Sequence, residues 1–130
     1  MGKWPCPMRS LERPILIVDD NRDSRDGLAD VLELRGYEIV ATNSGEAALR
    51  YFREGGEACL VILDIAMPGM SGIELRDALS CEPETADIPV IVLSATDSQY
   101  QLSNVEAYIR KPMDPDELLR VVDRVCGRVP

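Results

Sequence analysis

The stretch that decides the fold is Cys59-Leu60-Val61-Ile62-Leu63-Asp64-Ile65-Ala66-Met67-Pro68-Gly69-Met70-Ser71-Gly72. It begins as an unbroken apolar run of strand length, reaches a single carboxylate at Asp64, and then breaks into Pro and Gly. A run that is apolar at every position is typical of a strand buried on both faces, in a parallel sheet flanked by helices. In such sheets the functional site lies just past the carboxyl ends of the strands, where Asp64 stands.

Four more strand-like runs alternate with helical patterns along the chain. The predicted strands are Pro14–Asp20, Tyr37–Ala41, Ile88–Leu93 and Val105–Arg110, and the predicted helices begin near Asn21, Ser44, Ser71 and Asp114. Either Asp20 or Asn21 can cap the first helix, and Gly36 is a suitable residue to end it. Strands that alternate with helices predict an α/β fold, in which a five-stranded parallel sheet has helices on both faces.

Composition limits the range of functions. The chain has 130 residues, 45% hydrophobic and 28% charged, which suits one globular domain. We expect a leader over residues 1–13, the domain over 14–127 and a tail over 128–130. The net charge of −9 argues against direct nucleic-acid binding. Because no apolar run has membrane-spanning length and the N-terminus lacks a signal core, we expect no membrane association and a cytoplasmic location.

The chain contains no histidine and four cysteines. The first fact excludes a Ser-His-Asp triad, a Cys-His pair, a histidine-ligated zinc and a phosphohistidine of its own. The cysteines, Cys6, Cys59, Cys81 and Cys126, show no C-x-x-C spacing. We place Cys59 in the buried strand and Cys126 on a core-facing helix, and expect buried, reduced thiols. The even count leaves a disulfide open.

Charged and hydroxyl residues follow the predicted strands at their carboxyl ends. Asp19 and Asp20 end the first strand, Asp64 the third and Ser94 the fourth, and Lys111 follows the fifth. In a parallel sheet these ends meet at one edge, where three carboxylates would repel one another. A hard divalent cation such as Mg²⁺ and a lysine would neutralise them. Asp64 then becomes a potential nucleophile, because carboxylates accept phosphoryl groups.

These motifs, taken together, resemble the receiver domain of two-component response regulators. They are Asp-Asp after the first strand, Asp64-x-x-Met-Pro-Gly-Met-Ser-Gly after the third, Ser-Ala after the fourth and Lys-Pro after the fifth. The resemblance covers residues 14 to about 127. It implies a doubly wound (βα)5 fold with the flavodoxin-like strand order 2-1-3-4-5, and a signalling protein rather than an enzyme.

The resemblance also implies roles for the acidic residues. Asp64 would be the phosphoacceptor, and the donor would be a histidine kinase or a histidine phosphotransfer protein. Asp20, Asp64 and the backbone carbonyl of Ala66 would ligate Mg²⁺, with Mn²⁺ as an alternative. Asp19 would act on the metal largely through water.

The remaining motif residues would stabilise the phosphoryl group and transmit the signal. Lys111 would pair with Asp64 and then with the phosphoryl group, which Ser94 would also move to contact. Tyr108 matches an aromatic switch that turns inward when Ser94 moves. The bond between Lys111 and Pro112 would be cis. The output protein and the oligomeric state are left open.

Two features depart from the family pattern. Ala66 stands where members often have a larger or polar side chain, so the control of dephosphorylation, which the family links to this position and to Thr96, is left open. The segment from Thr96 to Asn104 is shorter than the usual fourth helix by roughly one to one and a half turns. We expect a shortened or irregular fourth helix there.

Other interpretations exist. Asp19 and Asp20 could simply cap a helix. The chain could be a receiver-like interaction module that is never phosphorylated. A phosphohydrolase would need a second carboxylate where Ala66 stands, and an FMN-binding protein would need a phosphate loop after the first strand. We expect a stand-alone receiver or a fragment of a longer regulator, and Met1 favours the former.

Overall fold

The computed structural model describes residues 13–64, 72–83, 85–94, 107–110 and 114–126. Within these ranges the strands are β1 Ile15–Val18, β2 Ile39–Thr42, β3 Leu60–Asp64, β4 Val90–Ser94 and β5 Ala107–Arg110. The helices are α2 Arg22–Leu34, α3 Gly45–Arg53, α4 Gly72–Ser80 and α5 Pro115–Val125. None of the helices described here has both the length and the apolar character needed to cross a membrane.

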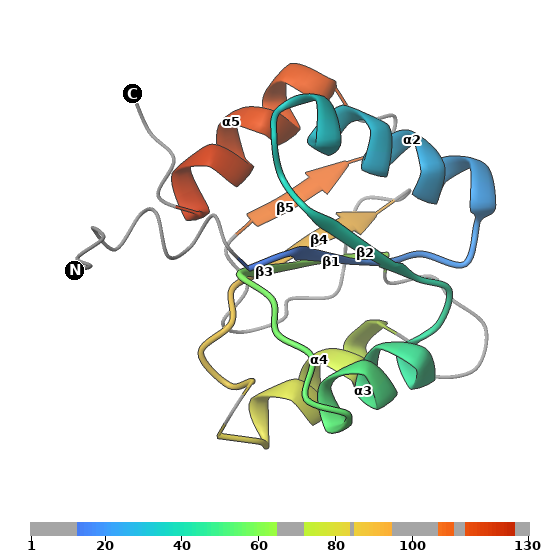
Figure 1. Ribbon diagram of the computed structural model, residues 1–130, viewed down its shortest axis with the longest axis vertical. Helices are drawn as coiled ribbons and strands as arrows, with labels where there is room; N and C mark the ends of the chain where they lie inside the picture. Colours follow the sequence, from blue (N-terminus) through green and yellow to red (C-terminus); the bar gives the residue numbers. More distant parts are fainter. Residues whose placement is uncertain (1–12, 65–71, 84, 95–106, 111–113, 127–130) are drawn as a thin grey trace.

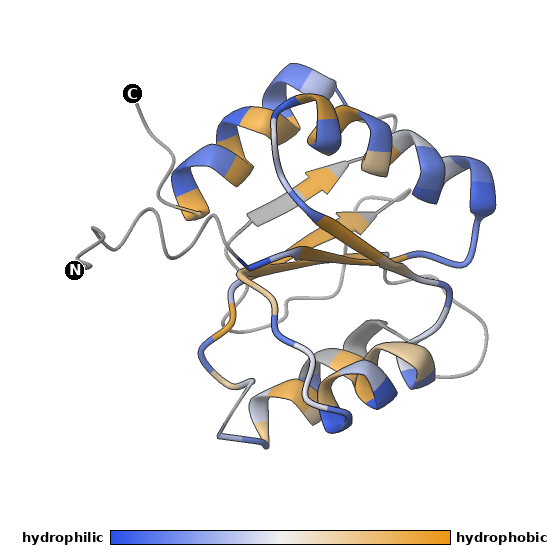
Figure 2. Cartoon of the chain, in the orientation of Figure 1, coloured by the Kyte–Doolittle hydropathy of each residue, from blue (hydrophilic) through white to orange (hydrophobic). Residues whose placement is uncertain are grey.

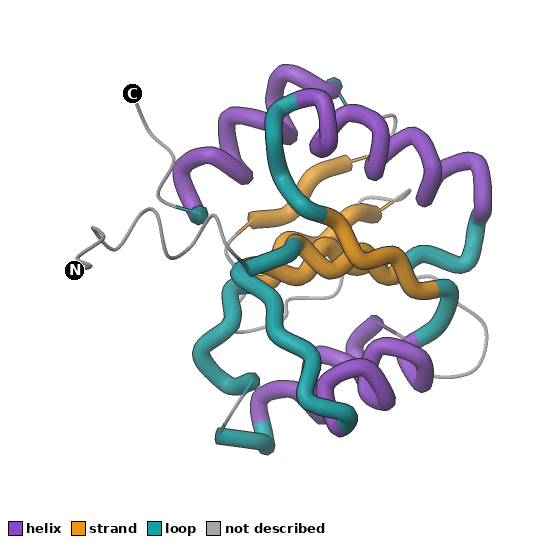
Figure 3. The backbone as a smooth tube through the Cα atoms, in the orientation of Figure 1, coloured by secondary structure: helices purple, strands orange, loops and turns teal. Residues whose placement is uncertain are grey.

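The strands form one parallel sheet in the order β2-β1-β3-β4-β5, which confirms the expected topology. Helices α2 and α5 cover one face of this sheet, and α3 and α4 cover the other (Figure 1). The loops that leave β1 and β2 lie at the right of the view (Figure 3). The carboxyl ends of these strands therefore open onto one side of the molecule, where the sequence predicts the site.

The continuous apolar runs fill two cores at once. Ile15 and Ile17 of β1 pack with α2 and α5, while Leu16 and Val18, which alternate with them, pack with α3 and α4. All four side chains are fully buried. Figure 2 shows the same pattern, since the apolar sides of the helices turn toward an apolar sheet. Because successive side chains of a strand point to opposite faces, a strand covered on both sides must be apolar at every position.

Helix ends follow the predicted signals. The side chain of Asn21 accepts a hydrogen bond from the Ser24 amide at 2.9 Å, so Asn21, not Asp20, caps α2. Ser44 caps α3, and Asp114 caps α5 ahead of Pro115. Gly36 follows α2 with a φ of 99°, a left-handed conformation that glycine adopts without steric cost.

Several predicted boundaries differ from the structure. β1 ends at Val18 rather than Asp20, and β4 spans Val90–Ser94 rather than Ile88–Leu93. β2 begins at Ile39 rather than Tyr37, because the Tyr37 amide donates back to the carbonyl of Leu32 in α2 at 3.2 Å. Cys59 lies just before β3 and is partly exposed, so it is not within the buried strand. Two further predictions lie outside the described residues. They are the Ser71 cap and the shortened or irregular helix expected after β4, between Thr96 and Asn104.

Candidate functional site

Asp19 directly follows β1 and is almost completely buried, with 1% of its surface exposed. Its backbone amide donates to the carbonyl of Thr42 at 3.1 Å, and its Oδ1 accepts from the Asn21 amide at 2.9 Å. The other carboxylate oxygen, Oδ2, is buried and has no hydrogen-bond partner among the described residues. Burying an unsatisfied carboxylate oxygen is costly, so this atom fits a cation ligand better than a structural cap.

The loop that carries the two acidic residues is held by the first turns of α2. Arg25 donates from Nη1 to the backbone carbonyl of Asp19 at 2.8 Å. Together with the cap at Asn21, this bond fixes the turn in which Asp20 projects as an exposed residue. Sequence reasoning did not identify Arg25. The only feature of the sequence that could have identified Arg25 is its position, one turn into a helix that directly follows two carboxylates.

Sheet register brings the other predicted strand ends to the same edge. Val18 of β1 pairs with Leu63 of β3. Asp19 and Asp64 are the residues directly after this pair, so their backbones lie at neighbouring strand ends. Asp64 pairs with Leu93 of β4, and Ser94 is the next residue along that strand. Ser94 in turn pairs with Arg110, the residue before Lys111. The backbone therefore places the ends of β1, β3, β4 and β5 side by side in register.

Several predicted site residues lie partly or wholly outside the described residues. Ala66, Thr96, Lys111 and Pro112 are among the residues whose placement is not described, and the side chains of Asp64, Ser94 and Tyr108 are not described either. Tyr108 is placed by its backbone in β5, where it pairs with Val92. The described side chains alone gather no cluster of three or more metal-ligating groups.

A separate hollow of about 670 Å³ lies away from this edge. Its walls come from α3, α4 and the segments that lead into β3 and β4, and include Arg13, Arg53, Glu57 and Glu82. Charges of both signs line it, and none of the predicted site residues that the structure describes is among its lining residues. The hollow is therefore not the predicted phosphoryl site.

Comparison with known proteins agrees with this geometry. The model of the response regulator receiver domain family matches residues 15–123. The polar-differentiation response regulator DivK of Brucella ovis is 30% identical, over 90% of this chain and 98% of DivK. The response regulator TrrA of Thermotoga maritima, solved in complex with Mg²⁺-BeF, is 36% identical with a TM-score of 0.77, over 87% of this chain and 98% of TrrA.

One relative is much longer than this chain. The CAI-1 autoinducer sensor kinase/phosphatase CqsS of Vibrio cholerae is 38% identical over 85% of this chain, and the match spans only 17% of CqsS. The shared region is thus one part of that protein. The family match extends over most of the present sequence, from the first residue of β1 into α5. The chain therefore belongs to the response regulator receiver domain family, the signalling module of two-component systems.

Proposed function

We propose that this receiver accepts a phosphoryl group on Asp64 from a phosphohistidine of a partner protein, in a Mg²⁺-dependent reaction. The observation that carries the proposal is the buried Oδ2 of Asp19 beside the end of β3, which has no hydrogen-bond partner within the described part of the chain. A buried carboxylate oxygen in that position would help to hold a cation bound by Asp20 and Asp64, which Asp19 would contact largely through water. Without a cation or another partner, burial of this charged oxygen would only lower the stability of the fold.

The proposed metal ligands combine described and undescribed residues. Asp20 and Asp64 would provide carboxylate oxygens, Ala66 its backbone carbonyl, and Asp19 a contact largely through water. Oxygen ligands of this kind suit Mg²⁺, with Mn²⁺ as the alternative. When bound, the cation supplies positive charge that offsets the carboxylates and the incoming phosphoryl oxygens. The complex of the related TrrA with Mg²⁺-BeF supports this choice.

The reaction needs a nucleophile and a donor. A carboxylate oxygen of Asp64 attacks the phosphorus, the phosphorus–nitrogen bond of the phosphohistidine breaks, and its electron pair stays on the imidazole nitrogen. Because this sequence contains no histidine, the phosphohistidine that donates the group lies outside it. We infer a histidine kinase or a histidine phosphotransfer protein. Lys111 and Ser94 would stabilise the charge on the phosphoryl oxygens.

Phosphorylation would then act through the edge formed by β4 and β5. Ser94 ends β4, and Tyr108 lies on the neighbouring strand β5, opposite Val92. We propose that Ser94 moves to contact the phosphoryl group and that Tyr108 turns inward in response. This change would shift the population toward a state with a different binding surface for an output protein.

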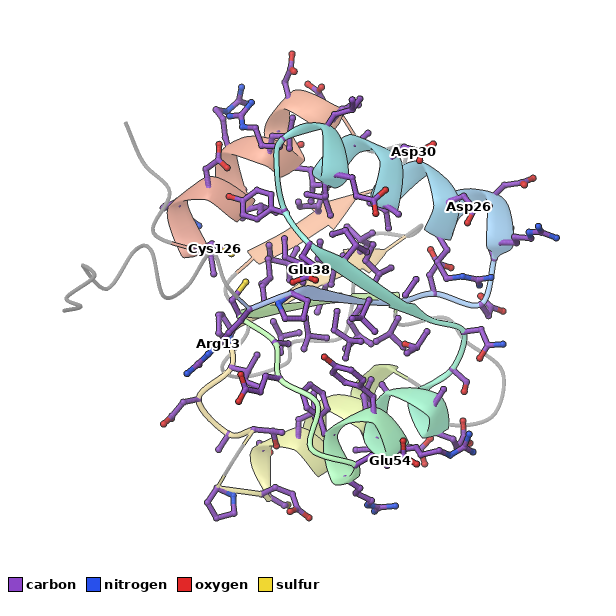
Figure 4. All side chains as sticks on the ribbon, in the orientation of Figure 1. Arg13, Asp26, Asp30, Glu38, Glu54 and Cys126 are labelled. Atoms are coloured by element: carbon purple, nitrogen blue, oxygen red, sulfur yellow. The ribbon has the colours of Figure 1, made fainter. Side chains whose placement is uncertain are left out.

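Phosphoramidate is a suitable probe, because it contains the same type of phosphorus–nitrogen bond as phosphohistidine. Purified protein with phosphoramidate and Mg²⁺ should gain one phosphoryl group by intact mass, and lose it on treatment with hydroxylamine, which cleaves acyl phosphates. Asp64→Asn should gain none. The matched control Asp30→Asn removes a carboxylate from the exposed side of α2 (Figure 4) and should behave as wild type.

Two further conditions sharpen the test. Chelation of divalent cations with EDTA should abolish the modification, and added Mg²⁺ should restore it. Equal labelling of wild type and Asp64→Asn would place the phosphoryl group elsewhere. No labelling of wild type by phosphoramidate or by any histidine kinase would support the alternative of an interaction module that is never phosphorylated.

A further inference from the structure

Cys59 and Cys126 form a close thiol pair at the end of the sheet opposite the predicted phosphoryl site. Their sulfur atoms lie 3.4 Å apart, although the two residues are 67 positions apart in sequence. Cys59 directly precedes β3, and Cys126 caps the carboxyl end of α5. Figure 4 places Cys126 and Arg13 at the left of the view, whereas Asp26, near the start of α2, lies at the right.

Both cysteines are held in place by their backbones. The amide of Cys59 donates to the carbonyl of Pro14 at 2.9 Å, which ties it to the start of β1. The amide of Cys126 donates to the carbonyl of Val122 at 2.8 Å within the last turn of α5. The approach of the two sulfur atoms is therefore a property of the fold. A disulfide has a sulfur–sulfur bond of about 2.0 Å, so each sulfur needs to move by less than one ångström.

The two thiols differ in their surroundings. Cys126 is buried, with 3% of its surface exposed, while Cys59 is partly exposed. The hydrogen bond with Cys126 lowers the pKa of the Cys59 thiol, burial opposes this effect, and the positive charge of Arg13 adds to the lowering. The thiolate is the reactive form of cysteine. Cys59 is thus the thiol that meets an oxidant first, and Cys126 lies in position to react with the product.

We propose that Cys59 and Cys126 are a redox-active pair, which a hydroperoxide converts into an intramolecular disulfide between the residue before β3 and the residue after α5. The Cys59 thiolate attacks the terminal peroxide oxygen, the oxygen–oxygen bond breaks, and water or an alcohol leaves. Cys59 is then a sulfenic acid. The sulfur of Cys126 attacks the Cys59 sulfur, the sulfur–oxygen bond breaks, and water leaves with the thiol proton. Two thiols lose two electrons in total, and the peroxide gains them.

The disulfide would join the end of α5 to the strand that carries Asp64 at its other end. Cross-linking residues so far apart in sequence restricts the unfolded chain strongly. Oxidation would therefore hold α5 on the sheet under conditions in which the reduced protein unfolds. The inference rests on the thiol geometry alone and does not depend on phosphorylation of Asp64.

The test treats the reduced, full-length protein with hydrogen peroxide, blocks the remaining thiols by alkylation, and identifies linked peptides by mass spectrometry. Wild type should lose two titratable thiols per chain and yield a peptide pair joined through Cys59 and Cys126. Its Tm should rise by roughly 10 °C, and dithiothreitol should reverse the rise. The matched control Cys81→Ser removes an exposed cysteine outside the pair and should behave in the same way.

Variants of the pair report the order of events. Cys126→Ser should leave Cys59 as a sulfenic acid that dimedone traps, with no rise in Tm. Cys59→Ser should show neither the linked peptide nor the rise. If a variant fails to fold, as judged by circular dichroism, the linked peptide in wild type still decides. A linkage through Cys6 or Cys81, a linkage between two chains, or oxidation of Cys59 with no linkage would each overturn the proposal.

Discussion

The hydroxyl of Tyr37 donates a hydrogen bond to Oδ1 of Asp123 at 2.5 Å, and this contact joins the loop after α2 to α5. Oδ2 of the same carboxylate accepts from both Nε and Nη2 of Arg35, the residue that caps α2. Asp123 is 8% exposed and so needs these partners. One carboxylate of α5 therefore connects the two helices that cover the same face of the sheet.

Replacing Tyr37 by Phe should lower the free energy of unfolding by about 1.5 kcal/mol, because a buried hydrogen bond to a charged group is lost. Replacing Asp123 by Ala should cost about 3 kcal/mol, because it removes the acceptor for both partners. Urea titrations monitored by circular dichroism measure both values. Arg22→Ala is the control, since its pairing with Asp26 is exposed and should change stability by less than about 0.5 kcal/mol.

The two substitutions should also be coupled. Since Tyr37 acts through Asp123, the double variant should lose clearly less than the sum of the single losses. Additive losses would mean that the hydroxyl stabilises the protein through a contact other than this carboxylate.

Gly56 follows α3 in a position where the ring of Tyr51 fills the space of a side chain. A Cβ atom on Gly56 would overlap the end of that ring, whose hydroxyl donates to the carbonyl of Glu57 at 2.6 Å. Gly56→Ala should therefore displace the ring, break this bond and lower the free energy of unfolding by about 1 kcal/mol. In Tyr51→Phe the overlap remains but the bond is already lost, so Gly56→Ala should cost less there. Equal costs in both backgrounds would contradict the role of the hydroxyl.

Replacing Gly27 by alanine should have the opposite effect and raise the stability. It lies on the exposed side of α2, and a Cβ atom there would meet no atom of the described residues within 4 Å. Because glycine in a helix interior is less favourable than alanine by about 0.5–1 kcal/mol, Gly27→Ala should raise the urea midpoint accordingly. An unchanged or lower midpoint would show that the residue makes a contact beyond those in the structure.

The strands and helix caps could be predicted from the sequence because their signals are local. The apolar runs of β1 and β3 and the caps at Ser44 and Asp114 each involve neighbouring residues only. The Asp123 carboxylate could not be predicted in this way. Its partners lie 86 and 88 positions away, and nothing near Asp123 marks it as buried. Arg35 offers a partial signal, because it follows the buried Leu28 and Leu32 of α2 at the helical spacing of seven and three residues.

The candidate site likewise combines features that could be predicted from the sequence with features that could not. The order of acidic, hydroxyl and lysine residues at the strand ends predicts which residues meet. The parallel register places the backbones of Asp19, Asp64 and Ser94 at the ends of neighbouring strands. The Oδ2 of Asp19, which lacks a partner among the residues that the structure describes, and the bond from Arg25 to the Asp19 backbone both depend on the fold of one turn. No spacing rule reports them, since both arise from the way the first turn of α2 folds back on the end of β1.

Arg25 provides the last test, because it holds the acidic turn without being a proposed metal ligand. Arg25→Ala should release the Asp19 carbonyl and weaken Mg²⁺ binding, measured by calorimetry, by roughly 10-fold, as is usual for residues that orient ligands. Arg22→Ala is the matched control, because it removes the same charge from the same helix turn without touching Asp19. If charge alone mattered, both variants would bind Mg²⁺ more tightly than wild type. Weaker binding in Arg25→Ala only, with unchanged binding in Arg22→Ala, would identify Arg25 as the residue that positions the acidic turn.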